Sequence, residues 1–97
     1  MSIANIINDQ IKCLDPMAFW AWGTKNKVAL SEGLQFKTSG MVGWKGQVQI
    51  TLNGSDLYDI AFVRVRKVKG EYKVITDKKV TDIFVEDLVN QIDIQVR

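Results

Sequence analysis

The spacing of apolar residues changes period once along the chain. Up to residue 14, apolar side chains recur every three or four positions, which predicts a helix over 3–14. A short aromatic helical segment is predicted over 16–22, between a proline and a glycine. From residue 34 onward apolar and polar positions alternate, and this pattern predicts strands at 34–39, 45–52, 57–65 and, more weakly, 71–76.

The connection between the second and third of these strands can be predicted in more detail. Asn53-Gly54 is a strong hairpin signal. Ile50 and Ile60 must face the same core, and in an antiparallel pair this requires an odd number of loop residues. We therefore expect a loop of three or five residues rather than a two-residue turn. Beyond Phe62 the alternation breaks, which predicts either a bulge near residue 63 or a strand that extends past the core.

A final helix is predicted over about 82–96, because apolar residues again recur at helical spacing. Thr81 or Asp82 is expected to cap it. It is expected to pack on the sheet through Phe84, Leu88 and Ile92. The complete pattern predicts a single α+β domain over residues 1–97, with an N-terminal helix, a short aromatic helical segment, a three- to four-stranded antiparallel meander sheet and a C-terminal helix packed on the sheet.

Composition narrows the chemistry that is open to the chain. Its 97 residues include no histidine, one cysteine and one proline. Without histidine, the usual general base and the commonest metal ligand are missing, and one cysteine cannot make an internal disulfide or a cysteine-rich zinc site. We therefore expect a protein that is not an enzyme and takes no cofactor or metal. No segment approaches the roughly 20 apolar residues of a membrane span, so we also expect no membrane association. Cys13, expected to be buried or half-buried, indicates a reducing and hence cytoplasmic location.

One acidic pair keeps an enzymatic or metal-binding alternative open. Asp56 and Asp59 lie close together beside the predicted hairpin loop. Two carboxyl groups can divide acid and base roles, or bind a divalent cation together. The more ordinary roles are turn capping for Asp56 and bonding to the backbone or a neighbouring lysine for Asp59.

The charge of the chain is small overall, at +2, but it is unevenly distributed. Residues 64–79 carry seven basic side chains against two acidic ones, whereas residues 80–97 carry one basic side chain against four acidic ones. Basic side chains on strands either bind the phosphates of nucleic acid or protect a sheet edge from aggregation. The residues of this candidate basic face are Arg64, Arg66, Lys67, Lys69 and Lys73.

The predicted order of elements is also that of double-stranded-RNA-binding domains, which have the order α-β-β-β-α. Lys78 and Lys79 resemble the lysine-rich segment that leads into the final helix of those domains. The acidic residues Asp82, Glu86 and Asp87, however, would repel phosphate at the same place. A nucleic-acid-binding domain is therefore the alternative interpretation.

A second candidate surface combines aromatic and basic residues. Trp20 and Trp22 precede Lys25 and Lys27 closely in the sequence. Such mixtures are typical of protein interfaces and of base stacking. The alternative is that both tryptophans cover the end of the core. We take Trp20, Trp22 and Lys25 as the candidate protein-binding surface.

Several short motifs resemble a set of small proteins from bacteriophages, prophages and other mobile elements. The motifs are Ala21-Trp22-Gly23-x-Lys25-Asn26, Leu34-Gln35-Phe36-Lys37, Lys45-Gly46-x-Val48, Thr51-Leu52-Asn53-Gly54-x-Asp56-Leu57-Tyr58-Asp59-Ile60 and Val85-Glu86-Asp87-Leu88-Val89. No activity, cofactor or ligand attaches to that set, so the resemblance implies an intracellular accessory protein. We expect a non-enzymatic binding protein that acts through protein contacts, with oligomeric state left open.

Overall fold

A computed structural model describes residues 3–39 and 43–96 of the chain. Its elements are α1 (Ile3–Leu14), α2 (Ala18–Ala21), β1 (Lys25–Leu30), β2 (Gly33–Lys37), β3 (Gln47–Leu52), β4 (Tyr58–Val68), β5 (Glu71–Ile83), the 3-10 turn η1 (Val85–Asp87) and α3 (Leu88–Val96). The strands form one antiparallel sheet in the order β1-β2-β3-β4-β5. The α+β meander with helices at both ends is confirmed, with five strands where the sequence predicts three or four.

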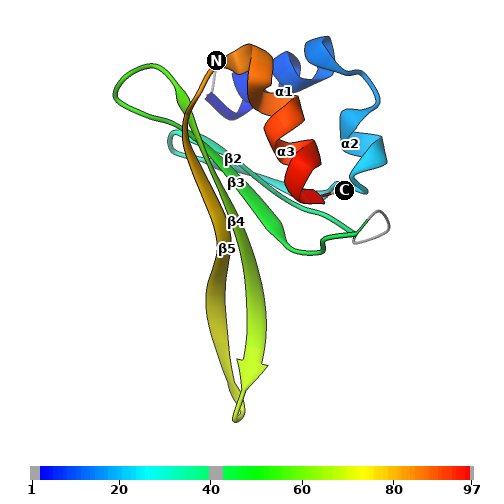
Figure 1. The fold of residues 1–97 in the computed structure, drawn as a ribbon, viewed down its shortest axis with the longest axis vertical. Helices are drawn as coiled ribbons and strands as arrows, with labels where there is room; N and C mark the ends of the chain where they lie inside the picture. The colour runs from blue at the N-terminus through cyan, green and yellow to red at the C-terminus, as the bar shows by residue number, and fades with distance from the viewer. Residues whose placement is uncertain (1–2, 40–42, 97) are drawn as a thin grey trace.

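The core lies between the helices and one face of the sheet, which we call the helix-side face. Helix α1 packs against β1 and β2, and α3 packs against β4. Figure 1 shows the helices gathered over one end of the sheet, while the β4–β5 hairpin projects away from them. The largest fully buried side chains include Trp22, Phe36, Phe62, Ile7, Ile11, Ile50, Ile60, Leu88 and Ile92. On the opposite, open face, Gln49 donates a hydrogen bond to Gln35, as suits a surface that faces water.

The hairpin between β3 and β4 confirms the register argument. Leu52 pairs with Tyr58, so the loop consists of the five residues 53–57. The Asn53 side chain organises this loop, because its Oδ1 accepts hydrogen bonds from the backbone N–H groups of Ser55 and Leu57. Ile50 pairs with Ile60, and both side chains are fully buried on the helix-side face.

The β4–β5 hairpin is longer than the sequence predicts. Its register shifts between Phe62 and Val63, where β5 contains one extra residue, Asp77, so the bulge expected near residue 63 lies on the partner strand. Of the two alternatives for β4, the extension past the core is confirmed, whereas the bulge lies on β5 instead. Val68 pairs with Glu71, and the two-residue turn between them has positive φ at Lys69 (52°) and Gly70 (84°). This is the geometry of a type I′ hairpin turn, where glycine is favoured.

The start of the last helix was predicted wrongly. Strand β5 continues to Ile83, which pairs with Tyr58, and α3 begins only at Leu88. Thr81 and Asp82 therefore belong to the strand and cap no helix. The strand continues because pairing with β4 satisfies its backbone groups as well as a helical turn would. The lysines at 78 and 79 lie in this strand as well, so they do not form the lead-in to a helix.

The packing predicted for the last helix is correct in two of three residues. Leu88 and Ile92 are fully buried, as expected. Phe84, in contrast, precedes the helix and is 57% exposed. Strand β1 was not predicted. Five of its six residues are exposed, and its sequence gives no alternating apolar pattern.

Candidate nucleic-acid interface

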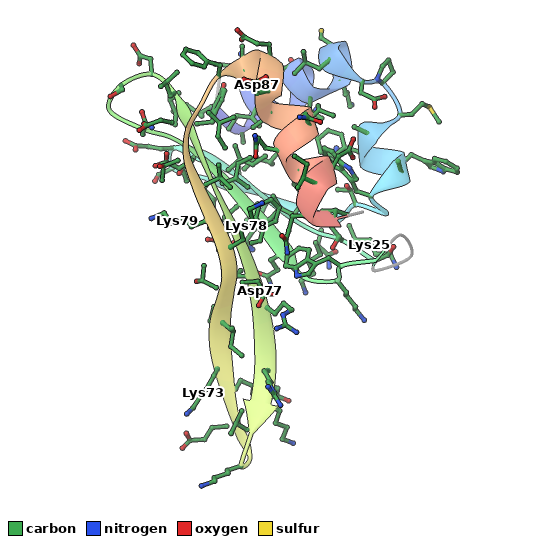
Figure 2. All side chains as sticks on the ribbon, viewed as in Figure 1. Lys25, Lys73, Asp77, Lys78, Lys79 and Asp87 are labelled. Carbon is green, nitrogen blue, oxygen red and sulfur yellow. The ribbon has the colours of Figure 1, made fainter. Side chains whose placement is uncertain are left out.

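The candidate basic face forms a distinct projecting element, which we call the arm and define as residues 64–75. Arg64, at one end of the arm, pairs with Ile75, at the other, and none of its residues is buried. The arm contains all five residues of the candidate basic face and a single acidic side chain, Glu71. Figure 2 shows Lys73 far out on the arm, whereas Lys25 lies on the body. The structure thus brings the basic-face residues together on one ribbon.

The two faces of the arm differ in chemistry. Cross-strand partners share a face, so Arg66 and Lys73 lie together on the continuation of the helix-side face. The other face carries Val65 opposite Val74 and Lys67 opposite Tyr72. The Lys67 ammonium lies 5.9 Å from the centre of the Tyr72 ring. Three of the arm's five basic residues, Arg64, Arg66 and Lys73, thus lie on the helix-side face with Ile75, Val68 and Glu71, whereas the other face is mainly apolar.

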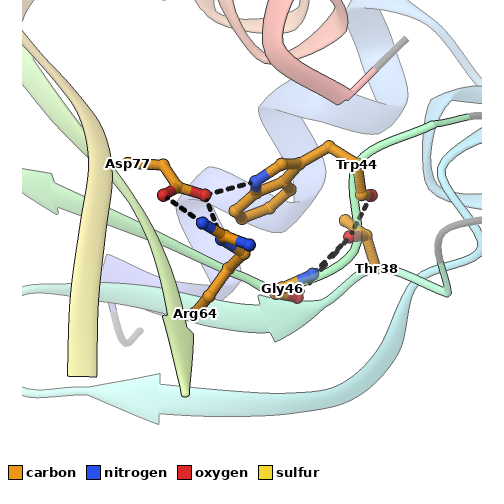
Figure 3. A network of polar contacts seen from close by, with 5 residues as sticks. All are labelled: Thr38, Trp44, Gly46, Arg64 and Asp77. Atoms are coloured by element: carbon orange, nitrogen blue, oxygen red, sulfur yellow. Dashed lines mark hydrogen bonds and ion pairs between the residues drawn. The ribbon is translucent and has the colours of Figure 1, made fainter. Parts of the chain in front are cut away.

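The base of the arm is held by a group of polar contacts that we call the base cluster (Figure 3). Arg64 forms an ion pair with Asp77, and its Nη2 donates a hydrogen bond to Asp77 Oδ1 over 2.9 Å. The indole Nε1 of Trp44 donates to Asp77 Oδ2 over 2.8 Å. The Trp44 ring also meets Phe62 edge to face, with centroids 5.6 Å apart. The bulge residue Asp77 therefore joins the arm to the chain before β3.

Thr38 holds the segment that leads into β3, residues 43–47, by further hydrogen bonds. The buried Thr38 hydroxyl donates to the carbonyl oxygen of Trp44 over 3.0 Å and accepts from the Gly46 N–H over 3.2 Å. Gly46 is required here, because a Cβ atom would lie 2.6 Å from both the Trp44 ring and the Val63 carbonyl oxygen. These contacts hold the 43–47 segment in place against the base of the arm.

Between this segment and the arm lies a cavity of about 710 Å³, which we call the basic notch. Strand β3 begins at Gln47, opposite Val63, so β4 has no partner on that side beyond this point. The described residues that line the notch are Lys37, Thr38, Lys45, Gly46, Gln47, Arg64, Val65 and Arg66. Four of them are basic and none is acidic. The notch therefore continues the positive charge of the arm onto the body.

The base cluster shifts the pKa values of both of its charged residues. Hydrogen bonds from Arg64 and Trp44 lower the pKa of Asp77, and the bond to Asp77 raises the pKa of Arg64. Asp77 thus stays ionised at neutral pH and offsets the charge of Arg64. The cations that remain for an external anion are Arg66, Lys67, Lys69 and Lys73 on the arm, with Lys37 and Lys45 in the notch.

The sequence did not single out Lys37, Lys45, Trp44 or Asp77. The two lysines lie on either side of a connection that carries no local signal of its own, and only the pairing of Lys37 with Gln47 brings them to the arm. Asp77 appeared to be one acid within a basic run. The register shift in β5 gives it its role, and a regular alternation pattern cannot reveal such a shift.

The second candidate surface is divided by the structure. Trp22 is fully buried, its ring stacks on Phe36 at 5.9 Å, and its Nε1 donates to Asp93. It therefore cannot belong to a binding surface. Trp20 is 78% exposed and Lys25 is exposed, so these two remain candidates. Lys27 is held by the body, because its Nζ donates to Asn8 and lies 3.8 Å from the centre of the Phe19 ring.

The acidic pair beside the hairpin loop has a structural role. Asp59 Oδ1 accepts hydrogen bonds from the Asn53 side chain over 3.0 Å and from the Asp82 backbone N–H over 3.1 Å. Asp56 occupies a left-handed position in the loop, with φ of 60°. Within residues 3–39 and 43–96, no group of three or more histidine, cysteine, aspartate or glutamate side chains is placed to hold a metal ion.

Comparisons with known proteins leave the function to be argued from the site itself. No family model, no curated protein and no solved structure matches the chain. The resemblance to phage and mobile-element proteins therefore stays a prediction. In the described part of the chain, no helix has the length and apolar character needed to cross a membrane.

Proposed function

We propose that this protein is a non-enzymatic nucleic-acid-binding protein that holds the phosphate backbone with its arm and basic notch. The supporting observation is the placement of the arm cations. They lie on a ribbon that projects from the body, with one acidic side chain among them, and no residue of the arm is buried in the core. A chain that needed these residues only for folding would not extend two strands beyond the helices that cover the sheet.

The shape of the arm suits this ligand. A two-stranded ribbon is narrow enough to enter the major groove of duplex DNA, and cations along it can neutralise phosphates on the groove walls. The basic notch at the base of the arm adds Lys37 and Lys45 to the same positive surface. Because the base cluster fixes the arm relative to the notch, binding costs less ordering of the protein.

The structure also indicates which of the arm cations should contribute least to phosphate binding. Arg64 is already paired with Asp77, so it has less charge to offer a phosphate than Arg66 or the arm lysines. Loss of Arg64 is expected to act mainly by loosening the base cluster. Edge protection, the other role considered for the arm cations, fits both arm strands, because β5 is the sheet edge and β4 has no partner on its other side beyond Val63. It does not account for Lys37 and Lys45, which line the notch.

The test is a measurement of binding to duplex and single-stranded oligonucleotides as a function of salt. A Lys67→Gln/Lys73→Gln variant should flatten the log–log salt dependence on duplex DNA by roughly 1.8, about 0.9 for each phosphate that the variant no longer neutralises. The matched control is Lys12→Gln/Lys79→Gln, which removes the same charge outside the arm and should leave the slope unchanged. Absence of wild-type binding at about 50 mM salt and micromolar protein would contradict the proposal.

A second function, protein binding through Trp20, is favoured by one observation. Trp20 is 78% exposed and Met17, three residues before it, is 56% exposed. Exposed tryptophan is typical of the centre of a protein interface. In the phage or mobile-element setting that the sequence resemblance suggests, this surface would bind a cytoplasmic host or phage protein. Trp20→Ala should then abolish co-purification of that partner from an element-bearing host, while Ile94→Ala, at another exposed apolar position, should not.

A further inference from the structure

A groove lies on the body between α1 and the segment that follows β5. It has a volume of about 410 Å³ and is lined by Ile6, Asp9, Gln10, Cys13, Leu14 and Val85. Ile6 and Leu14 are more exposed than is usual for large apolar residues, and so is Phe84 beside Val85. Cys13 is exposed here, contrary to the sequence prediction of a buried or half-buried thiol. The groove is thus an uncovered apolar surface.

The groove is bordered by negative charge. Asp9 lines it directly, and the exposed residues Glu86 and Asp87 follow Val85 in the chain. Lys12 lies on another side of α1, where its charge contributes to the lowered pKa of Lys27. A partner that fits this groove should therefore combine apolar side chains with positive charge.

The open face of the arm has that combination. Val65 and Val74 form a cross-strand pair, and Tyr72 lies beside them, opposite Lys67. Val74 is 70% exposed and Tyr72 is 74% exposed. Phosphate contacts would leave these apolar side chains uncovered. A two-stranded hairpin is at best marginally stable alone in water, so the arm would be stabilised by a surface that covers this face.

The two surfaces lie at opposite ends of the molecule. Figure 2 shows Lys73 on the arm and Asp87, two residues after the groove residue Val85, far apart along the longest axis, which spans 41 Å. The arm of one molecule therefore cannot reach its own groove. The surfaces are complementary in charge, because the mainly apolar docking face of the arm carries Lys67 and the apolar groove carries Asp9.

We propose that the arm of one copy of this chain docks, through Val65, Tyr72 and Val74, into the α1 groove of a second copy. The contact joins two different surfaces, so it leaves one free arm and one free groove and can extend head to tail. The apolar patch on the arm is small compared with the roughly 800 Å² per partner of stable interfaces, so the association is weak and depends on concentration and salt. The proposal does not rest on nucleic-acid binding.

The experiment is sedimentation velocity without nucleic acid, at protein concentrations from about 10 μM to 1 mM. The wild type should form species that grow with concentration at low salt. Lys67→Glu on the arm and Asp9→Lys in the groove should each weaken self-association at least about tenfold, because like charges then meet. The matched control Lys12→Glu changes a charge on α1 outside the groove and should associate like the wild type. Circular dichroism and melting of each variant check that it is folded.

Mixing the two variants separates this arrangement from others. Each variant alone brings like charges together, but in an equal mixture both kinds of contact pair opposite charges. Asp9 of the Lys67→Glu protein meets Lys67 of the Asp9→Lys protein, and the introduced lysine meets the introduced glutamate. The mixture should therefore recover self-association that grows with concentration. Alkylation of Cys13, inside the groove, should slow as the wild-type concentration rises, but not in the Lys67→Glu variant. A wild type that stays monomeric throughout would overturn the proposal. Self-association that Asp9→Lys leaves intact would equally refute the groove as the docking site.

Discussion

The β4–β5 hairpin is one continuous ribbon, yet its two halves differ in almost every property except pairing. Beside the body, Ile60 and Phe62 on β4 are fully buried under the helices. Two and four residues beyond Phe62, on the same face, β4 continues with Arg64 and Arg66, which are exposed. The backbone pairing runs through both halves. Cover by the helices, rather than strand pairing, therefore determines which residues each half can carry.

The difference between the two halves also marks where residues that stabilise the fold give way to residues that are available for binding. The register shift at Asp77 lies where the helix cover ends, and Asp77 holds Arg64 and Trp44 at that point. On the body side, side chains are selected for packing. On the arm side, they are free to be charged or aromatic, as a binding surface requires.

The largest expected effect is the difference between Phe62→Ala and Val65→Ala. Phe62 is fully buried and contacts the Trp44 ring, so its loss should cost about 3–5 kcal/mol of unfolding free energy. Val65 is on the arm, and its loss should stay within about 0.5 kcal/mol. Urea unfolding of both variants measures the difference. Similar costs for the two would show that the arm belongs to the cooperative core.

Hydrogen exchange should separate the halves in the unmodified protein. Amides paired within the arm should exchange at least about tenfold faster than those around Ile60, because the arm has no buried side chain to oppose local opening. Exchange followed residue by residue by NMR provides the measurement. Equal protection in dilute protein would mean that the arm opens only with the whole domain. A rise in arm protection with protein concentration would agree with docking between copies.

A smaller and local effect is expected for Gly70→Ala at the tip of the arm. Gly70 has φ of +84°, which costs an alanine roughly 1 kcal/mol, although nothing lies within 4 Å of the added Cβ. Exchange of the arm amides should rise about fivefold while global unfolding stays unchanged. Gly54→Ala is the matched control, since Gly54 is equally open but does not have positive φ. A change in the midpoint of global unfolding would show that the tip of the arm unfolds together with the core.

The smallest expected effect is that of Asp77→Asn, and it should depend on pH. The pKa of Asp77 is lowered in the folded protein, first by the hydrogen bond from Arg64 and then by that from Trp44. Its carboxylate therefore stabilises the fold above pH about 4, and this contribution is lost as the pH falls through the lowered pKa. The melting temperatures of the wild type and the variant should thus differ at neutral pH and converge in acid.

A double-mutant cycle checks the cause of that pH dependence. When Arg64→Gln is already present, Asp77→Asn should have less effect, because the main partner of the carboxylate is gone. An undiminished effect would assign the stabilisation to the Trp44 hydrogen bond instead. The cycle therefore shows which contact holds the base of the arm.

The sequence predicted those parts of the fold in which periodicity and burial agree. Ile7 and Ile11 on α1, and Ile50 opposite Ile60 in the sheet, are core residues as their spacing indicates. Parity alone predicted an odd loop of three or five residues, and the structure has five. Strand β1 could not be predicted, because an edge strand with exposed side chains has no apolar period. The far end of β5 was missed because its pairing with β4, rather than its own polar residues, makes it a strand.

The candidate site was predictable as a set of charges but not as a shape. The run from Arg64 to Lys73 was recognised from the sequence, yet nothing local shows that it forms an arm beyond the core. Trp20 and Trp22 are two residues apart and looked equivalent. Only the tertiary structure separates them, because Trp22 stacks on Phe36 and bonds to Asp93 whereas Trp20 faces solvent.

The hydrogen bond from Trp44 to Asp77 gives the molecule a built-in optical sensor. The chain has three tryptophans, and Trp44 is the one whose indole bonds to Asp77, whereas that of Trp22 bonds to Asp93. With Trp20→Phe and Trp22→Phe in place, all indole emission would come from that single position. The wavelength and lifetime of that emission depend on whether the indole bonds to the Asp77 carboxylate. They would therefore report movement of the arm relative to the body in real time, without an attached dye.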